Sequence, residues 1–388
     1  MVFDHKVTHL TASAQRYVSL LSNAHNGILL NRNTLKTLIK AKYKPTPRSI
    51  NLFAGATISL MLVACGGATL DDIQDNLANG EDININISIN DNDDLVISLT
   101  DNDGGTDTDD TAFLSGFQMG ETLGNVDETI SNLETILNNN DAISIVAQID
   151  HQANAASVGL DLRPTSVTLF GNPNLGTPLM QINQLTGLDL PQKMFAREDA
   201  TGQSNIAYNS ADYLSGRYGL SEGQATLDII NNALGSLATG ASGQEFIPVS
   251  VTTPSMEEGI VVVQSANDME TTFGNLQQAI DSAGPLTIVA VVDHSANAES
   301  VGLSLRPTRL VVFGNPNVGT PLMQSGQSIG IDLPQKMLVY TDADGQVMVA
   351  YNDPAFLAER HGISDQADII NTITQALGNL AGVATSAP

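Results

Sequence analysis

The strongest constraint on the fold of this chain is an internal duplication. Residues 150–221 match residues 293–364 at a constant offset of 143 positions, and 43 of the 72 aligned positions are identical. The register extends outward without gaps to copies at 117–239 and 260–382. Repeats of about 20–50 residues would build a solenoid, whereas a segment of about 120 residues can bury a core of its own. The sequence therefore predicts two similar domains.

Two further segments separate and precede the copies. Residues 240–259 combine Gly, Ser, Thr and Pro, a composition typical of a linker between domains. Residues 65–116 hold 13 Asp and Glu side chains and neither Lys nor Arg. Like charges repel along such a stretch, so we expect an extended, acidic spacer. Alternating apolar residues on both sides of residues 90–94 predict one two-stranded hairpin within it.

The N-terminal segment, residues 1–64, carries the opposite charge. It holds eight basic residues and one acid, whereas the rest of the chain holds eight basic residues and 41 acids. A basic stretch at 36–48 precedes an apolar stretch at 52–64, an order typical of a secretory signal peptide, here with an extended basic region. A helix of that apolar length spans about 20 Å, less than the ~30 Å hydrocarbon core of a bilayer. We therefore expect a cleaved signal and not a stable transmembrane helix.

The apolar stretch ends at the only cysteine of the chain, Cys65. The sequence Leu-Val-Ala-Cys-Gly at residues 62–66 resembles the lipobox of bacterial lipoproteins. This resemblance implies cleavage before Cys65 and lipidation of its thiol, which would anchor the protein in a lipid bilayer of the cell envelope, facing the periplasm or the exterior. The alternative is that Cys65 is a buried core residue in an apolar strand.

The composition excludes several classes of protein. With 16 Lys and Arg against 42 Asp and Glu, the formal net charge is -26. Nucleic-acid binding is excluded, because phosphates are neutralised by clustered basic side chains. A single cysteine cannot build a disulfide framework. No apolar run reaches about 18 residues, so a polytopic membrane protein is also excluded.

Each copy contains the pattern of an α+β domain. In the first copy the predicted strands are 117–119, 142–149, 166–170, 193–198 and 205–208. The predicted helices begin after Asn125, at residue 211 and at residue 226, and a further helical turn opens at Thr177-Pro178 after a turn at 171–174. This order predicts an antiparallel sheet with helices on one face.

The two copies also share four motifs in the same order. These are Leu-Arg-Pro-Thr, Phe-Gly-Asn-Pro-Asn-x-Gly-Thr-Pro-Leu-Met-Gln, Leu-Pro-x-Lys and Tyr-Asn. In this order they resemble the bacterial and archaeal domain-of-unknown-function family numbered 302, across nearly the whole of both copies. The resemblance implies two tandem copies of a β-α-β(4)-α domain, similar to the TATA-binding-protein-like class, in which a curved antiparallel sheet packs against a helix. It also implies that the copies pair as an intrachain pseudo-dimer, and it brings no agreed activity.

The candidate binding residues are polar side chains that occur at equivalent positions of both copies. Six of the eight basic residues after position 64 form such pairs: Arg163 with Arg306, Lys193 with Lys336, and Arg217 with Arg360. One interpretation is structural, with Arg163 donating to backbone carbonyls or a carboxylate and Lys193 pairing with Asp189, four residues earlier. The other is functional: Lys193 and Arg163 hold a small anionic ligand on the concave face of the sheet.

Three other pairs are candidates for the same reason: His151 with His294, Asn172 with Asn315, and Tyr208 with Tyr351. Asp150 precedes His151, and adjacent strand residues point to opposite faces, so these two do not form a dyad. Either the histidine is hydrogen-bonded within the fold, or it acts as a general base or metal ligand; one His per copy without Cys is too few for a zinc site. Asn172 belongs either to a structural turn or to an anion site of backbone N–H groups. The tyrosine hydroxyls can reach a polar partner.

Two hypotheses about function follow. The first is a non-catalytic, lipid-anchored binding or interaction protein of the cell envelope. The second is an enzyme that acts on a small anionic substrate through the Lys, His and Tyr pairs, which must then converge within hydrogen-bond reach. The chain has no nucleophile elbow, Ser-His-Asp order or paired-carboxylate motif, and it indicates no particular cofactor. We favour the first hypothesis.

Overall fold

The computed structural model describes residues 116–248, 251 and 253–387, together with the backbone of three short strands nearer the N-terminus. The chain divides into two compact units, Met1–Thr106 and Asp107–Pro388. Cys65 and most residues of the predicted signal peptide and of the acidic spacer lie outside the described residues.

In the first unit the three strands form one antiparallel sheet in the order β1-β2-β3. They are β1 (Ile50–Asn51), β2 (Asn84–Ile89) and β3 (Leu95–Thr100). Ile87 of β2 is paired with Ile97 of β3, which confirms the hairpin predicted from the alternating apolar residues.

The second unit contains both copies of the duplicated sequence. The elements of the first copy are β4 (Phe117–Glu121), α4 (Val126–Asn138), β5 (Ser144–Asp150), α5 (His151–Ser157), β6 (Thr165–Gly171), α6 (Pro173–Ile182), η2 (Gln184–Leu188), β7 (Gln192–Glu198), β8 (Ser204–Asn209), α7 (Ala211–Tyr218), η3 (Ser221–Gly223) and α8 (Gln224–Ser242). The elements of the second copy are β9 (Ile260–Gln264), α9 (Met269–Ser282), β10 (Thr287–Asp293), α10 (His294–Ser300), β11 (Thr308–Gly314), α11 (Pro316–Ser325), η4 (Gln327–Ile331), β12 (Gln335–Thr341), β13 (Val347–Asn352), α12 (Pro354–Arg360) and α13 (Ala367–Thr385).

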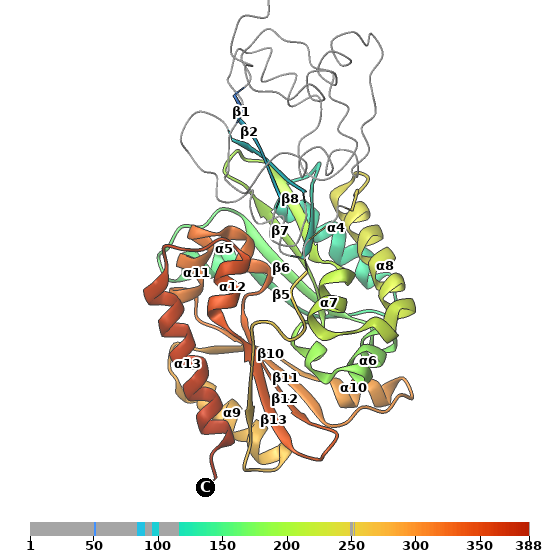
Figure 1. Cartoon of the computed structure of the whole chain (residues 1–388), viewed down its shortest axis with the longest axis vertical. Helices are drawn as coiled ribbons and strands as arrows, with labels where there is room; N and C mark the ends of the chain where they lie inside the picture. The colour runs from blue at the N-terminus through green and yellow to red at the C-terminus, as the bar shows by residue number, and fades with distance from the viewer. Residues whose placement is uncertain are drawn as a thin grey trace, which may run out of the picture. The chain divides into compact units, whose positions relative to one another are not determined.

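Each copy forms one five-stranded antiparallel sheet. The strand orders are β4-β8-β7-β6-β5 in the first copy and β9-β13-β12-β11-β10 in the second, so equivalent strands occupy equivalent places. The long helices α4 and α8 pack on each other and on the first sheet, and α9 and α13 do the same on the second (Figure 1). This architecture confirms the predicted α+β class with two tandem copies.

The alternation of side chains along the strands gives each sheet two different faces. In β12, Met337 and Val339 belong to an apolar cluster with Phe273 and Leu276 of helix α9. Leu338, which lies between them in sequence, belongs instead to a cluster that includes residues of the first copy. One face of the sheet therefore builds the core under the helices, and the other face meets the other copy.

Helix α4 begins where the sequence predicts. The Asn125 side chain accepts a hydrogen bond from the backbone N–H of Glu128 at 2.9 Å, and the Glu128 carboxylate accepts one from the Asn125 N–H at 3.1 Å. This reciprocal arrangement satisfies two N–H groups that have no partner within the helix. Leu133 and Leu137, four residues apart on α4, are buried in the core.

Helix α6 begins earlier than predicted. It spans Pro173–Ile182, so its N-cap is Asn172 and not Thr177, and there is no separate turn before it. The physical reason is that Asn172 followed by Pro173 is itself a strong helix start, because Asn caps well and Pro fits the first helical position. Pro178 consequently lies inside the helix.

Helix α5 was not predicted. The Asp150 side chain accepts a hydrogen bond from the N–H of Ala153 at 2.8 Å and thereby caps α5. His151 is the first residue of this helix, so the strand geometry predicted for it is wrong. An Asp followed by a stretch containing three alanines is a helix-start signal, and the β-rich residues before it concealed that signal.

The two copies contact each other through their 3₁₀ segments. η2 of the first copy contacts β11, β12 and β13, and η4 of the second copy contacts β6 and β7. Close approach requires glycine here: a Cβ on Gly187 would lie 2.9 Å from Leu338 Cδ1, and one on Gly330 would lie 2.6 Å from Phe195 Cε2. We call residues 184–189 and 327–332 the arms, since each copy lays one across the sheet of the other.

Candidate functional site

Several polar residues that the copies share gather where the arms meet the sheets, together with Tyr213, Tyr218 and His361. We call this group the charge cluster, and every member is at most 6% exposed. Its members are Asp189, Lys193, Asn209, Tyr213, Arg217 and Tyr218 of the first copy and Asp332, Lys336, Asn352, Arg360 and His361 of the second.

Lys193 joins the two copies. Its Nζ lies 3.0 Å from Oδ1 of Asp189, which is the pair predicted from their spacing, and 3.0 Å from Oδ1 of Asp332 in the other copy. Lys336, at the equivalent position, lies 3.5 Å from the same Oδ1 of Asp189. Both lysines therefore contact the same carboxylate oxygen of Asp189.

The two arginines bind one carboxylate of their own copy and one amide of the other. Arg217 Nη1 donates to Asp189 Oδ2 at 2.9 Å, and its Nη2 donates to Asn352 Oδ1 at 2.9 Å. Arg360 Nη1 donates to Asp332 Oδ2 at 2.6 Å. Its Nη2 donates to Oδ1 of Asn209 at 2.8 Å. The contacts thus repeat with approximate two-fold symmetry.

Aromatic side chains break this symmetry. The Tyr213 hydroxyl accepts from Nη1 of Arg217 at 2.8 Å and from Nη1 of Arg360 at 3.3 Å, whereas the equivalent residue is Phe356. The arginines also stack on these rings, with Arg360 4.1 Å from the centre of Tyr213 and Arg217 4.7 Å from that of Phe356. Only the first copy therefore places a hydroxyl between the two guanidinium groups.

A second asymmetry lies at the carboxylates. Asp189 Oδ2 accepts a hydrogen bond from the Tyr218 hydroxyl at 2.7 Å, whereas Asp332 Oδ2 lies 2.9 Å from Nε2 of His361. Burial lowers the pKa of His361, so its ring is neutral at neutral pH. Because a carboxylate only accepts, Nε2 carries the proton, and Nδ1 accepts from the Ser328 hydroxyl at 3.0 Å.

The carboxylates of the cluster are ionised. Burial alone would raise the pKa of Asp189, but Lys193, Lys336 and Arg217 hold it well below its usual range. Arg360 and Lys193 lower the pKa of Asp332 in the same way. The cluster therefore contains two negative charges at neutral pH, against four basic side chains.

The lysines differ from each other. Burial acts against the charged form of both, but Asp332 and Asp189 raise the pKa of Lys193 above its usual value. Burial and the nearby charge of Lys193 lower the pKa of Lys336 to about 7. The pKa values of two residues at equivalent positions are thus shifted in opposite directions.

Arg163 and Arg306 flank the charge cluster and also bind the opposite copy. Arg163 Nη2 donates to Oε1 of Gln327 at 2.7 Å, and Arg306 Nε donates to Oε1 of Gln184 at 2.9 Å. Arg163 Nε also donates to the backbone carbonyl of Glu198 at 3.1 Å, which agrees with the structural interpretation of this residue. Each glutamine lies at the start of an arm, so the arginines hold the arms in place.

The two candidate histidines also lie against the arms. His151 Nε2 is 3.1 Å from the backbone carbonyl of Gly330, and His294 packs its ring on Gly187. Burial lowers the pKa of both histidines to about 4. They are therefore neutral at neutral pH, and His151 donates to a backbone carbonyl.

The remaining candidates lie elsewhere. Tyr208 and Lys193 lie on opposite faces of the sheet. In the second copy, the equivalent Tyr351 is paired with Met337, which faces the helices, whereas the neighbouring Lys336 faces the other copy. The ring of Tyr208 lies 5.3 Å from that of Phe246. Asn172 and Asn315 cap their helices, accepting at 3.0 Å from the N–H two residues later. The Lys, His and Tyr groups of the catalytic alternative thus do not converge.

Sequence reasoning missed several members of the charge cluster. Asp332, Asn209 and Asn352 were not considered, and neither were Tyr213, Tyr218, His361 nor the arm glutamines. A signal was available for some of them, since Asp189 and Asp332 precede Leu-Pro-Gln-Lys-Met in both copies and the two asparagines end the repeated Ala-Tyr-Asn. Tyr218 and His361 gave no such signal, because the copies differ there.

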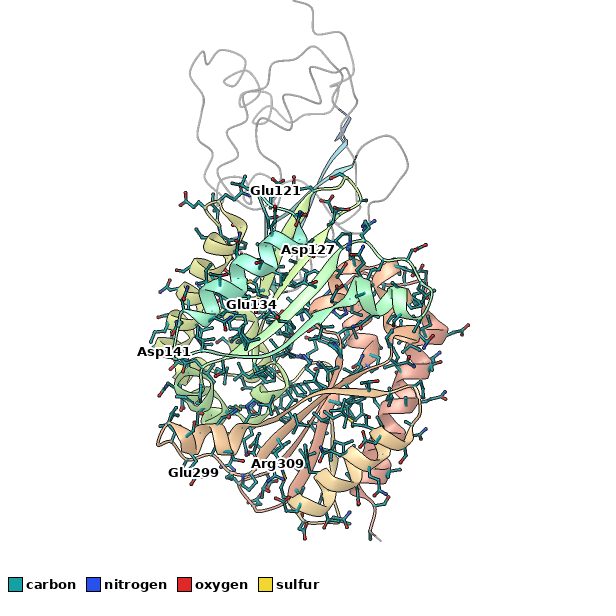
Figure 2. The ribbon with its side chains drawn as sticks, turned by 180° about the vertical axis from the view of Figure 1, so that it is seen from behind. Glu121, Asp127, Glu134, Asp141, Glu299 and Arg309 are labelled. Carbon is teal, nitrogen blue, oxygen red and sulfur yellow. The ribbon has the colours of Figure 1, made fainter. Side chains whose placement is uncertain are left out.

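Outside the charge cluster, the described surface is acidic. Glu121, Asp127, Glu134 and Asp141 extend outward around β4 and α4, and all four are exposed (Figure 2). Of the eight basic residues after position 64, five are buried: Lys193, Arg197, Arg217, Lys336 and Arg360. The described part of the chain therefore buries five of its eight Lys and Arg side chains, while carboxylates such as these four are exposed.

Two hollows lie on the surface of the second copy. The first, of ≈ 460 Å³, lies between α12 and α13 and is lined by small and apolar residues such as Ala358, Gly362 and Ile370. The second lies between α9 and α13. Neither is lined by a member of the charge cluster. Among the described residues, no group of three or more His, Cys, Asp or Glu side chains is placed to hold a metal ion.

The fold and the cluster define a tandem α+β protein whose copies exchange arms around buried ion pairs. The chain belongs to the family described as Domain of unknown function DUF302, which matches residues 120–237 and 261–380 and thus both copies.

Similar curated proteins carry a different name. "Fluoride-specific ion channel FluC 1" of Brucella suis biovar 1 and its namesake of Brucella abortus biovar 1 are each 32% identical to this chain over 173 residues. The match covers 43% of this chain, 68% of the first relative and 64% of the second, so it spans about two thirds of their length. In the described part of this chain, every helix is too short or too polar to span a bilayer.

Two solved structures are also similar. The crystal structure of an uncharacterized conserved DUF302 protein from Bacillus stearothermophilus has 16% identity and a TM-score of 0.31, and it covers 33% of this chain and 99% of that one. DynU16, a putative protein in the dynemicin biosynthetic locus, has 11% identity and a TM-score of 0.19, over 70% of this chain and 98% of that one.

Proposed function

We propose that this protein is a non-catalytic binding or interaction module, built as an intrachain pseudo-dimer of two DUF302 copies and anchored to a bilayer through Cys65. The observation that carries the proposal is where the shared cations are placed. Arg163, Lys193 and Arg217 all contact the opposite copy, and none of them lines either of the two hollows described above.

A catalytic role would need reactive groups within reach of a substrate. Lys193 and His151 are at most 4% exposed and hydrogen-bond to protein groups, and Tyr208 lies on the other face of the sheet. General acid–base catalysis requires these groups within about 3 Å of one reacting atom. The non-catalytic role therefore fits the geometry better than the enzyme does.

Recognition would then fall to the outer surface of the two copies. That surface presents carboxylates such as Glu121, Asp127 and Glu134, and most cations are buried. Electrostatic complementarity favours a partner with a basic surface and speeds its encounter at low ionic strength. A small anionic ligand is the other candidate, and it would have to displace Asp189 or Gln327 from Lys193 or Arg163.

Capture of partners from the host envelope tests the interaction role. The full chain is cross-linked in its host at low and at raised ionic strength, beside a variant with Glu121, Asp127 and Glu134 changed to Gln. We expect one basic protein to be captured in a salt-sensitive manner and to be lost from the variant. Capture that is equal for both proteins would overturn the acidic surface as the recognition site.

A thermal-shift screen with small anions tests the ligand alternative. Fluoride belongs in this screen because the similar Brucella proteins are named fluoride-specific ion channels, and chloride and sulfate at equal ionic strength serve as controls. A ligand present at 100 times its Kd adds about 2.7 kcal/mol to the free energy of unfolding. Stabilisation of that size by one anion alone would replace the interaction role with ligand binding.

The anchoring proposal has its own test. A Cys65→Ser variant lacks the thiol to which lipid would be attached. We expect the unaltered protein in the membrane fraction of the host and the variant in the soluble envelope fraction. Equal membrane retention of both would contradict a lipid anchor at Cys65.

A further inference from the structure

Two buried lysines share one carboxylate oxygen at the centre of the charge cluster. Lys193 Nζ and Lys336 Nζ lie 3.0 Å and 3.5 Å from Oδ1 of Asp189. Both side chains are at most 4% exposed. Ammonium groups this close repel each other strongly, because water does not screen them.

Lys336 lies among the charged and titratable groups of the charge cluster, of which Lys193, Asp189 and Asp332 act on it directly. Besides Lys336, these groups are Lys193 on β7, Asp189 and Asp332 at the ends of the arms, Tyr213, Arg217 and Tyr218 on α7, and Arg360 and His361 at the end of α12. Four of these nine groups, Lys336 included, are basic side chains with high intrinsic pKa values, and two are carboxylates. With both lysines charged, the cluster would hold an excess of two positive charges away from water.

The two lysines do not share the carboxylates equally. Lys193 has Asp189 and Asp332 both at 3.0 Å, whereas Lys336 has only Asp189, at 3.5 Å. The second carboxylate is engaged by Arg360 and His361. A buried cation with one distant partner is costly, and losing a proton is the usual way to avoid that cost.

We propose that Lys336 is the uncharged member of this lysine pair in the folded protein above neutral pH, and that protonating it weakens the contact between the two copies. Lys193 would then be the permanent cation that joins Asp189 to Asp332. This is a regulatory property of the interface between the copies, and it does not depend on which partner the outer surface binds.

The direction of the effect follows from proton linkage. The pKa of Lys336 is lowered to about 7 by burial and by Lys193, from 10.5 in the unfolded chain. Between these two values the unfolded chain binds more protons than the folded protein, so stability rises as the pH rises. Below about pH 7 both states are protonated, and the contribution of Lys336 becomes constant. The contribution of Lys336 to the free energy of unfolding is therefore smallest below about pH 7 and rises up to about pH 10.5.

Unfolding of the full chain between pH 7 and pH 10 tests the proposal. Unaltered protein is compared with Lys336→Met, which keeps the unbranched side chain as far as Cε and removes the amine. In the unaltered protein, we expect the ratio of folded to unfolded protein to rise with pH more steeply than in the variant. The difference is up to about tenfold per pH unit, because the unfolded chain binds one more proton than the folded protein. Equal pH dependence of the two proteins would overturn the proposal.

Direct titration of the lysine decides the matter even if the variant fails to fold. The chain has seven lysines, and only Lys193 and Lys336 follow the predicted signal peptide, so carbon-13 labelling of lysine Cε gives few NMR signals to assign. We expect one buried lysine to titrate near pH 7, and to titrate at a higher pH in Lys193→Met, where the neighbouring ammonium is gone. Two buried lysines that both titrate above pH 10 in the unaltered protein would overturn the proposal.

Discussion

The two copies bury charged residues at equivalent positions, but the partners of the buried aspartate differ between the first copy and the second. Asp189 of the first copy contacts two lysines, one arginine and a tyrosine, whereas Asp332 contacts one lysine, one arginine and a neutral histidine. Residues at equivalent positions therefore make different contacts in the same interface.

This difference follows from joining the copies in one chain. In a symmetric pair of identical chains, each residue near the two-fold axis faces its own counterpart and cannot change alone. In a tandem chain, Tyr213 and Phe356 can differ, and one hydroxyl then serves both Arg217 and Arg360. Both copies keep the same fold, while the side chains at the centre of the interface between them differ.

The largest expected effect tests the inequality of the two carboxylates. Asp189→Asn keeps the shape of the side chain and removes the charge that faces Lys193, Lys336 and Arg217. Breaking buried ion pairs from one side costs about 3–5 kcal/mol. We expect a loss of this size, and a smaller loss for Asp332→Asn, in chemical unfolding at pH 7. Equal losses would show that the two carboxylates are equivalent after all.

Acid stability tests a site where the copies should behave alike. His151 and His294 have pKa values of about 4 in the folded protein and about 6.5 when unfolded. The unfolded chain binds more protons between these values, so stability is complete above pH 6.5 and decreases toward pH 4, by roughly 3 kcal/mol per histidine. His151→Asn and His294→Asn should each remove about half of this acid sensitivity. A single variant that removes all of it would break the equivalence.

The glycines of the arms test how tightly each arm fits the opposite sheet. A Cβ at residue 330 would meet the ring of Phe195 at 2.6 Å, and one at residue 187 would meet a flexible leucine tip at 2.9 Å. Overpacking costs about 1–3 kcal/mol, so Gly330→Ala should destabilise the protein more than Gly187→Ala. Gly274→Ala in α9 is the matched control, because its Cβ would meet nothing within 4 Å, and helix propensity predicts slight stabilisation. Losses as small as those of the control would refute a close contact.

The smallest expected effect compares the caps of equivalent helices. Asn125 caps α4 within a reciprocal pair with Glu128, whereas Asp268 caps α9 by accepting from the N–H of Thr271 at 2.8 Å. Replacing either cap by Ala removes about 1 kcal/mol. We expect Asn125→Ala to cost slightly less in thermal unfolding, since the Glu128 carboxylate still accepts from the backbone N–H of residue 125, whereas Asp268→Ala also removes a negative charge at the start of α9. A larger loss for Asn125→Ala would contradict this order.

Much of the fold could be predicted because its signals are local. The periodicity of α4 and its Asn125 cap lie within a few residues of each other, as does the alternation along β2 and β3. The pair of Lys193 with Asp189 was also predictable, since the two are four residues apart and short loops keep such neighbours together. The start of α6 was predicted wrongly because two Asn/Thr-Pro signals compete within six residues, and the earlier one prevails.

The candidate site could be predicted only in its membership and not in its contacts. Repetition marked Arg163, Lys193, Arg217 and their equivalents as residues that an acidic chain retains twice. It also marked Tyr208 and Asn172, which serve a core and a helix cap. Repetition indicates that a side chain is required in each copy. It does not distinguish a side chain that makes contacts within its own copy from one that makes contacts with the other copy.

The amino-acid sequence by itself determined the doubling of one α+β domain, the period of its strands and helices, and the separation of an acidic body from a basic N-terminus. The tertiary structure alone decided that Lys193 reaches Asp332, 139 residues away, and that Arg217 reaches Asn352, 135 residues away. Such contacts arise when each arm docks on the other sheet. Their energies depend on burial and on distances across the interface, which no pattern of neighbouring residues encodes.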